Sequence, residues 1–150
     1  MLTGLLHTHN LLRYLILLLI LISLVKSFSG WFGKKQYLPG DKKIALFTLI
    51  AAHLQLVLGL TIYFMKEWHT QLGNMGNPAR FWSLEHLSMM IVAIALITIG
   101  YSSSKKAATD EAKHKRVAIF YLLALIVIFL AIPWPWSAPE IARGWVPGGQ

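Results

Sequence analysis

The chain has 150 residues, of which 56% are hydrophobic and only 13% are charged. Soluble domains carry about 25% charged residues, so this composition favours a single membrane domain over a soluble one. The net charge of +8 is concentrated beside the apolar blocks rather than on a base-reading helix, which argues against nucleic-acid binding. The absence of cysteine excludes disulfides, thiolate metal sites and covalently attached haem.

The first apolar block predicts a membrane-spanning helix over residues 5–25. The segment lacks the basic start and the small-residue cleavage site of a secretory signal peptide, so we expect the helix to be retained. His9 and Arg13 are four residues apart and therefore lie on one face of this helix. A loop with five lysines is predicted at residues 26–43, and Asp41 is expected to cap the next helix.

A second helix is predicted over residues 42–65, with His53 near its middle, and a third over residues 81–100. The third helix is the most informative span, because Glu85 and His86 stand side by side about one turn inside its outer boundary. Ionisable residues within a span are costly and usually face other protein, water or a ligand. We therefore expect these side chains to point toward the interior of the bundle.

A fourth helix, without charged residues, is predicted over residues 117–132, and the Pro- and Gly-rich tail 137–150 is expected to be irregular. The loops 26–43 and 101–116 contain ten of the 14 basic residues. The positive-inside rule then places both loops in the cytoplasm and both termini outside. The sequence thus predicts an all-α fold, an integral membrane up-down-up-down four-helix bundle over residues 1–136.

Several polar groups in these spans share a depth at which they can meet. At about 1.5 Å of rise per residue, His9 lies roughly 6 Å and His86 roughly 8 Å from the outer boundary, with Arg13 near 12 Å and His53 near 18 Å. Two imidazoles at matching depth can hold the iron of a non-covalent haem b between them. Arg13 would then meet a haem propionate. A ligand pair that uses His53 is the alternative.

The same side chains allow two other interpretations. Intramembrane histidines can hydrogen-bond to neighbouring helices, and Glu85 can neutralise Arg13, in which case the chain is a cofactor-free accessory subunit of a membrane complex. His9 and His86, together with that charged pair, also supply the donors and the proton acceptor that a quinone pocket needs. The residue pattern alone leaves these alternatives open.

Two further polar residues are expected to be structural. Gln55 points about 200° away from His53 around its helix, so it is expected to bridge helices rather than to share a site with that histidine. His114 stands among lysines in a basic loop and is expected to be solvated. The chain contains no nucleophile–base motif, phosphate loop or zinc-binding HExxH, which favours an electron-transfer or accessory subunit over a stand-alone enzyme.

Four segments are spread over nearly the whole chain up to Trp136: HTHNLLRY at 7–14, LFTLIAAHLQLVLGLTIYF at 46–64, RFWSLEHLSMMIVAIALITIGYS at 80–102 and IPWPW at 132–136. They resemble a family of short bacterial inner-membrane proteins labelled cytochrome b or cytochrome b-like. The resemblance implies four transmembrane helices, location in the bacterial inner membrane, and haem b in respiratory or quinone-linked electron transfer. It also places histidines at the positions of His9, His53 and His86. The chain lacks the length and the paired histidines of large respiratory cytochrome b subunits, which argues against a two-haem electron path.

Overall fold

The computed structural model describes residues 1–145, and within this range the regular structure is entirely helical. The four long helices are α1 (Leu2–Phe32), α2 (Pro39–Met65), α3 (His86–Lys105) and α4 (Asp110–Ala131). Between α2 and α3 lie a 3-10 turn, η1 (Trp68–Gln71), and a π-helical turn, η2 (Phe81–Glu85), which leads directly into α3. Each long helix, with η2 counted as part of α3, is long and apolar enough to cross a membrane.

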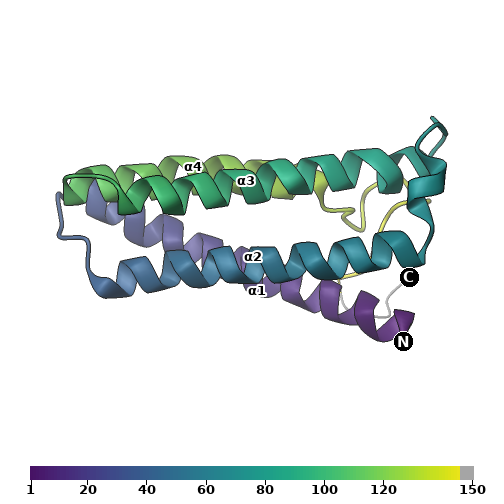
Figure 1. Cartoon of the computed structure of the whole chain (residues 1–150), viewed down its shortest axis with the longest axis horizontal. Helices are drawn as coiled ribbons and strands as arrows, with labels where there is room; N and C mark the ends of the chain where they lie inside the picture. The colour runs from purple at the N-terminus through teal and green to yellow at the C-terminus, as the bar shows by residue number, and fades with distance from the viewer. Residues whose placement is uncertain (146–150) are drawn as a thin grey trace.

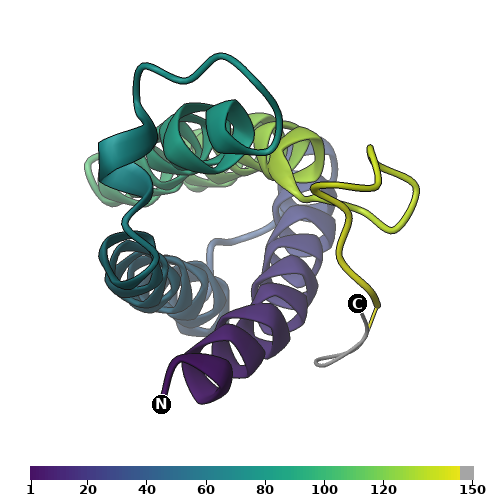
Figure 2. The same cartoon turned by 90° about the vertical axis from the view of Figure 1, so that its right-hand side faces the viewer.

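Consecutive helices run in opposite directions and form a four-cornered bundle, as Figures 1 and 2 show. α3 packs along α4, and α1 packs against both α2 and α4, so α1 and α3 lie diagonally across the bundle. The N-terminus and the segment after α4 lie at the same end of the bundle, which we call the terminal end (Figure 1). The predicted up-down-up-down helical bundle is confirmed, whereas the membrane side that each end faces stays a prediction.

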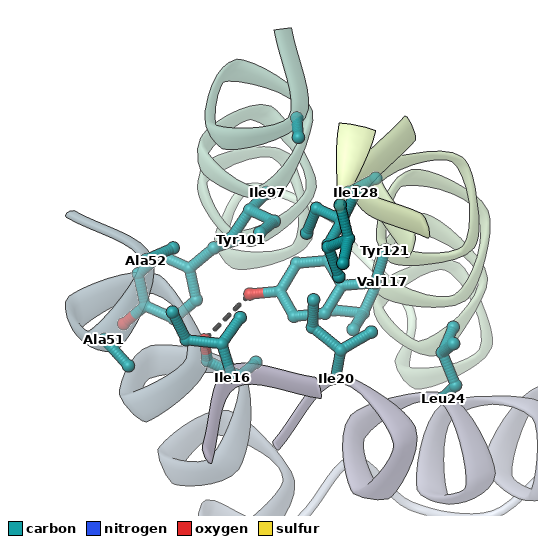
Figure 3. Packing of buried hydrophobic residues seen from close by; sticks show 14 residues of the cluster. Ile16, Ile20, Leu24, Ala51, Ala52, Ile97, Tyr101, Val117, Tyr121 and Ile128 are labelled. Atoms are coloured by element: carbon teal, nitrogen blue, oxygen red, sulfur yellow. Dashed lines mark hydrogen bonds between the residues drawn. The ribbon is translucent and has the colours of Figure 1, made fainter. Parts of the chain in front are cut away.

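The middle of the bundle is packed with small and branched side chains (Figure 3). Ile20, Ala93 and Ile97 are fully buried there. Tyr121 is also fully buried, and its hydroxyl donates a 2.8 Å hydrogen bond to the Ala45 carbonyl, which ties α4 to α2 across the interior. Buried polar groups are stabilised in this way when they have a hydrogen-bond partner. This packed layer fills the interior in the middle of the bundle, away from the terminal end.

The outer surface of the bundle is apolar as well. Leu18 on α1, Val57 on α2 and Phe129 on α4 are between 51% and 62% exposed. A soluble bundle would turn such side chains inward and place charged residues on the surface, so this surface is suited to contact with lipid tails. The apolar blocks of the sequence therefore mark the lipid-facing parts of the helices together with the core.

The helices extend further than the sequence predicted at the end opposite the termini. α1 continues past residue 25 to Phe32, and α4 begins at Asp110 rather than at residue 117. The start of α4 is stabilised by Thr109, whose hydroxyl accepts a hydrogen bond of 3.2 Å from the Ala112 N–H. Hydropathy marks the part of a helix that lies in lipid, and it does not register polar helical turns beyond the bilayer.

Asp41 was expected to precede α2 as its cap, but α2 begins at Pro39 and Asp41 is its third residue. From there its carboxylate caps the helix by bonding back to Leu38, and it also joins α2 to α1. Its Oδ2 atom accepts a 2.8 Å hydrogen bond from the Leu38 N–H, and its Oδ1 atom lies 2.9 Å from Lys26 Nζ. The carboxylate is almost fully buried, whereas the lysine is about half exposed. A negative charge in the first turn of a helix also interacts favourably with the helix dipole.

We expect Asp41→Ala to lower the free energy of unfolding by about 1–2 kcal/mol, because the change removes both the cap and the ion pair. Titration with SDS in mixed micelles, followed by circular dichroism, measures this value. Glu111→Ala is the matched control, since Glu111 is an exposed acidic residue in the first turn of α4. An effect of Asp41→Ala no larger than that of the control would contradict the prediction.

Candidate functional site

A cavity of about 650 Å³ lies inside the terminal end of the bundle. Its volume falls within the range of about 300–1,000 Å³ that is typical of cofactor and ligand pockets. Its walls come from α1, α2, η1, η2, α3 and the segment after α4. The apolar part of the lining includes Leu6, Leu56, Leu60, Leu87, Met90 and Ile94. Such a wall suits a mainly apolar ligand.

His9 on α1 and His86 on α3 face each other at this cavity. Their ring centroids are 6.4 Å apart, and their ring planes meet at 63°. Because α1 and α3 occupy diagonal corners of the bundle, the pair reaches across its interior. The structure thus brings together the two histidines that the sequence places at a similar depth.

The orientation of His86 is fixed by the end of α4. Its Nδ1 atom lies 2.9 Å from the Ala131 carbonyl oxygen. That carbonyl is available because the residue four positions later is Pro135, which has no N–H to donate. A carbonyl can only accept, so Nδ1 carries the proton and Nε2 keeps a free lone pair. Histidines that bind a metal are typically oriented by such a bond from the other ring nitrogen.

His9 is held against α2 through its backbone. Gln55 Nε2 donates a 2.8 Å hydrogen bond to the His9 carbonyl, so Gln55 bridges two helices as the sequence predicted. The His9 Nδ1 and Gln55 Oε1 atoms are buried and have no hydrogen-bond partner among residues 1–145. Gly59 faces the same ring, and a Cβ atom there would lie 3.1 Å from His9 Cε1. Glycine therefore keeps space beside an incompletely satisfied polar group, which is a feature of binding sites.

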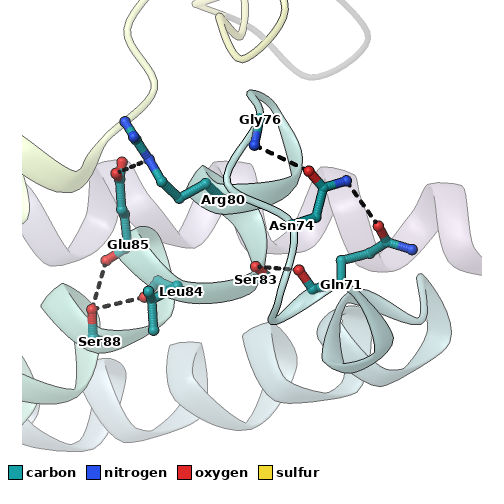
Figure 4. Close-up of polar contacts among 8 residues, drawn as sticks. All are labelled: Gln71, Asn74, Gly76, Arg80, Ser83, Leu84, Glu85 and Ser88. Carbon is teal, nitrogen blue, oxygen red and sulfur yellow. Dashed lines mark hydrogen bonds and ion pairs between the residues drawn. The ribbon is translucent and has the colours of Figure 1, made fainter.

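The expected neutralisation of Arg13 by Glu85 is not found. Glu85 Oε1 lies 2.6 Å from Arg80 Nε instead (Figure 4). The π-helical turn explains this pairing, because residues five apart lie on the same face of such a turn. Arg13 Nη2 donates a 2.8 Å hydrogen bond to the Tyr14 hydroxyl, which in turn donates to the Trp145 carbonyl. Neither Arg13 nor Glu85 lines the cavity.

His53 lies apart from the histidine pair. Its side chain is exposed on the outer surface of α2, and its Nδ1 atom lies 2.8 Å from the Leu49 carbonyl of the same helix. It is absent from the residues that line the cavity. The alternative ligand pair that includes His53 therefore has no geometric support.

The segment after α4 forms a wall of the cavity, which the sequence did not indicate. Pro139 and Arg143 line it, and the Arg143 guanidinium lies 4.7 Å from the centre of the Trp82 ring. Partial burial lowers the pKa of Arg143, although an arginine side chain stays protonated in proteins. Residues 137–145 contain turns without a helix or strand, and the rest of the tail that was predicted to be irregular, residues 146–150, lies outside the described part. Because this segment has no helical or strand periodicity, its sequence does not indicate which part of the bundle it covers.

A second polar cluster, around His114, lies at the opposite end of the bundle. His114 was expected to be solvated, but it is only 1% exposed. Its ring packs edge-on against Tyr37, with centroids 4.8 Å apart, and its Nε2 atom lies 3.3 Å from the Gln36 carbonyl oxygen. Burial raises the pKa of the Tyr37 phenol. Gly30, which lies within α1, makes room for the His114 ring, so this histidine is part of the packing between helices.

Among residues 1–145, no group of three or more histidine or acidic side chains is placed to hold a metal ion. A zinc site typically has at least three protein ligands. A haem iron differs, because the porphyrin supplies the remaining ligands and the protein needs to supply only the axial ones. The His9–His86 pair fits that requirement.

No family model, curated protein or solved structure matches the chain. The resemblance to cytochrome b-like membrane proteins therefore stays a prediction.

Proposed function

We propose that the protein is a small b-type haem protein of the membrane, with His9 and His86 as the axial ligands. The 6.4 Å separation of their ring centroids carries the proposal. A bond between a metal and an imidazole nitrogen is about 2 Å long, so two rings on opposite sides of one metal ion have centroids about 6 Å apart. The separation in the structure agrees with this requirement.

Three other observations support the proposal. The cavity is bounded mainly by apolar side chains, the bond from His86 to the Ala131 carbonyl leaves Nε2 available, and Gly59 keeps space beside the His9 ring. A bound haem supplies one-electron chemistry, and the protein supplies the ligands and their surroundings. In this chain the surroundings are the mainly apolar walls of the cavity.

If His9 and His86 both held the iron, the haem would supply electron transfer rather than a binding place for a substrate. The four membrane-compatible helices favour a redox partner that is itself in the bilayer, such as a quinone or another membrane subunit. We further propose that the protein lies in the bacterial inner membrane with the terminal end outside. The concentration of basic residues at the opposite end supports this orientation.

A second candidate function is that of a cofactor-free accessory subunit. Two hydrogen bonds favour it, because His86 to Ala131 joins α3 to α4, and Gln55 to His9 joins α2 to α1. Such bonds between helices stabilise membrane bundles by about 0.6 kcal/mol on average. On this interpretation the histidines hold the helices together and bind no cofactor.

An absorption spectrum distinguishes the two candidates. Protein made in haem-replete bacterial cells and purified in mild detergent is expected to contain haem and polypeptide in about a 1:1 molar ratio. Its reduced-minus-oxidised spectrum should show changes in the Soret and α bands. Folded protein from the same cells without these bands would contradict the haem proposal and favour the accessory subunit.

A further inference from the structure

Two cationic side chains, Lys66 and Arg143, line the cavity that contains the histidine pair. They come from different segments: Lys66 directly follows the last residue of α2, and Arg143 belongs to the segment after α4. The rest of the lining consists of apolar and uncharged polar side chains together with the histidines. The charge of the cavity is therefore positive and is carried by these two residues.

Arg143 is held in place by its neighbours. Its guanidinium lies over the Trp82 ring, its backbone N–H donates a 3.0 Å hydrogen bond to the Pro133 carbonyl, and its Nη1 atom donates to the Ala142 carbonyl at 2.9 Å. The hydrogen bonds of this side chain within residues 1–145 all use Nη1. The Nε and Nη2 donors thus stay available in a side chain that has already lost much of its freedom, which favours binding of a carboxylate.

Arg13, whose spacing from His9 suggested a role at a propionate, has a buried Nε atom without a hydrogen-bond partner among residues 1–145, but it lies outside the cavity lining. Its Nη2 atom donates to the Tyr14 hydroxyl. A haem carries two carboxylates on one edge, and carboxylates taken into an apolar site need cations or hydrogen-bond donors as partners. Lys66 and Arg143 are the lysine and arginine side chains that line the cavity.

We propose that Arg143 and Lys66 bind the two carboxylates of the haem whose iron His9 and His86 hold. This assignment rests on the proposed function and replaces Arg13 as the propionate partner. The ligand is thereby specified as a dicarboxylate tetrapyrrole. The segment after α4 then takes part in cofactor binding through Arg143, in addition to covering the cavity.

The test compares haem b with its dimethyl ester, in which both carboxylates are blocked. The full chain, freed of haem and kept in detergent, is titrated with each compound, and the dissociation constant is measured from the Soret absorbance. The variants are Arg143→Gln and Lys66→Gln. The matched controls are Arg80→Gln, a cation at the same end that does not line the cavity, and Lys42→Gln, an exposed lysine in the first turn of α2.

We expect each cavity variant to weaken binding of haem b about tenfold, as is typical for loss of a hydrogen bond to a charged group. The same variants should bind the dimethyl ester as the unchanged protein does, the controls should change neither constant, and Arg143→Lys should restore part of the affinity. Equal binding of haem and its ester by the unchanged protein would overturn the carboxylate assignment alone. Failure of that protein to bind either compound would overturn the proposed function and this assignment with it.

Discussion

Replacement of His86 by alanine is expected to abolish the absorption spectrum of a haem with two imidazole ligands and to weaken haem binding by more than a hundredfold. Loss of a group that only orients a metal ligand costs about 10–100-fold, and loss of the ligand itself costs more. His9→Ala should have the same effect, because each ring supplies an axial position. Haem content after purification and the position of the Soret band measure the outcome.

His53→Ala is the matched control for these variants. His53 is also a histidine within a membrane-compatible helix, but it is exposed on the outer surface of α2 and lies outside the cavity. Its replacement should leave haem content and spectrum unchanged. An intact spectrum in His86→Ala, or a loss of haem in His53→Ala equal to that in His86→Ala, would contradict the assignment of ligands.

The second large effect is expected from Gly30→Ala at the end of the bundle opposite the cavity. An added Cβ atom would overlap the ring of His114, which is buried between the helices. Overpacking of this kind costs about 1–3 kcal/mol. That loss exceeds the gain of about 1 kcal/mol that alanine usually brings over glycine within a helix.

Gly4→Ala provides the control for Gly30→Ala within the same helix. No atom lies within 4 Å of a Cβ added at Gly4, so this change should leave stability unchanged or raise it slightly. SDS titration of both variants measures the difference in the free energy of unfolding. Equal stability of the two variants would contradict the close packing of Gly30 on His114. Haem content, which depends on the other end of the bundle, should stay normal in the folded fraction of Gly30→Ala.

Much of the fold could be predicted because the signals behind it are strong and local. Long apolar blocks identify membrane-compatible helices, and proline and glycine between them mark the turns. The fixed rise of an α-helix also placed His9 and His86 at a similar depth before any contact was known. By contrast, the sequence did not indicate that α1 continues through Gly30 to Phe32, because glycine often ends a helix. Nor did it indicate that α4 begins at Asp110, because hydropathy is insensitive to a polar helical turn.

The remaining parts of the site depend on contacts that no periodicity encodes. Arg143 reaches the cavity from a segment without regular structure, and Glu85 turns to Arg80 because of a local π-helical turn. His114 is buried because Gly30 continues α1 instead of breaking it. Each of these outcomes depends on the local backbone, which a pattern of residue types does not determine.

Electron paramagnetic resonance of the oxidised, purified protein tests most directly whether two imidazoles hold one haem iron. We predict a low-spin ferric signal typical of two nitrogen ligands in the unchanged protein. The signal should be replaced by a high-spin one, or lost together with the haem, in His9→Ala and His86→Ala. A high-spin ferric signal in the unchanged protein, or protein that contains no iron after growth in haem-replete cells, would contradict this account.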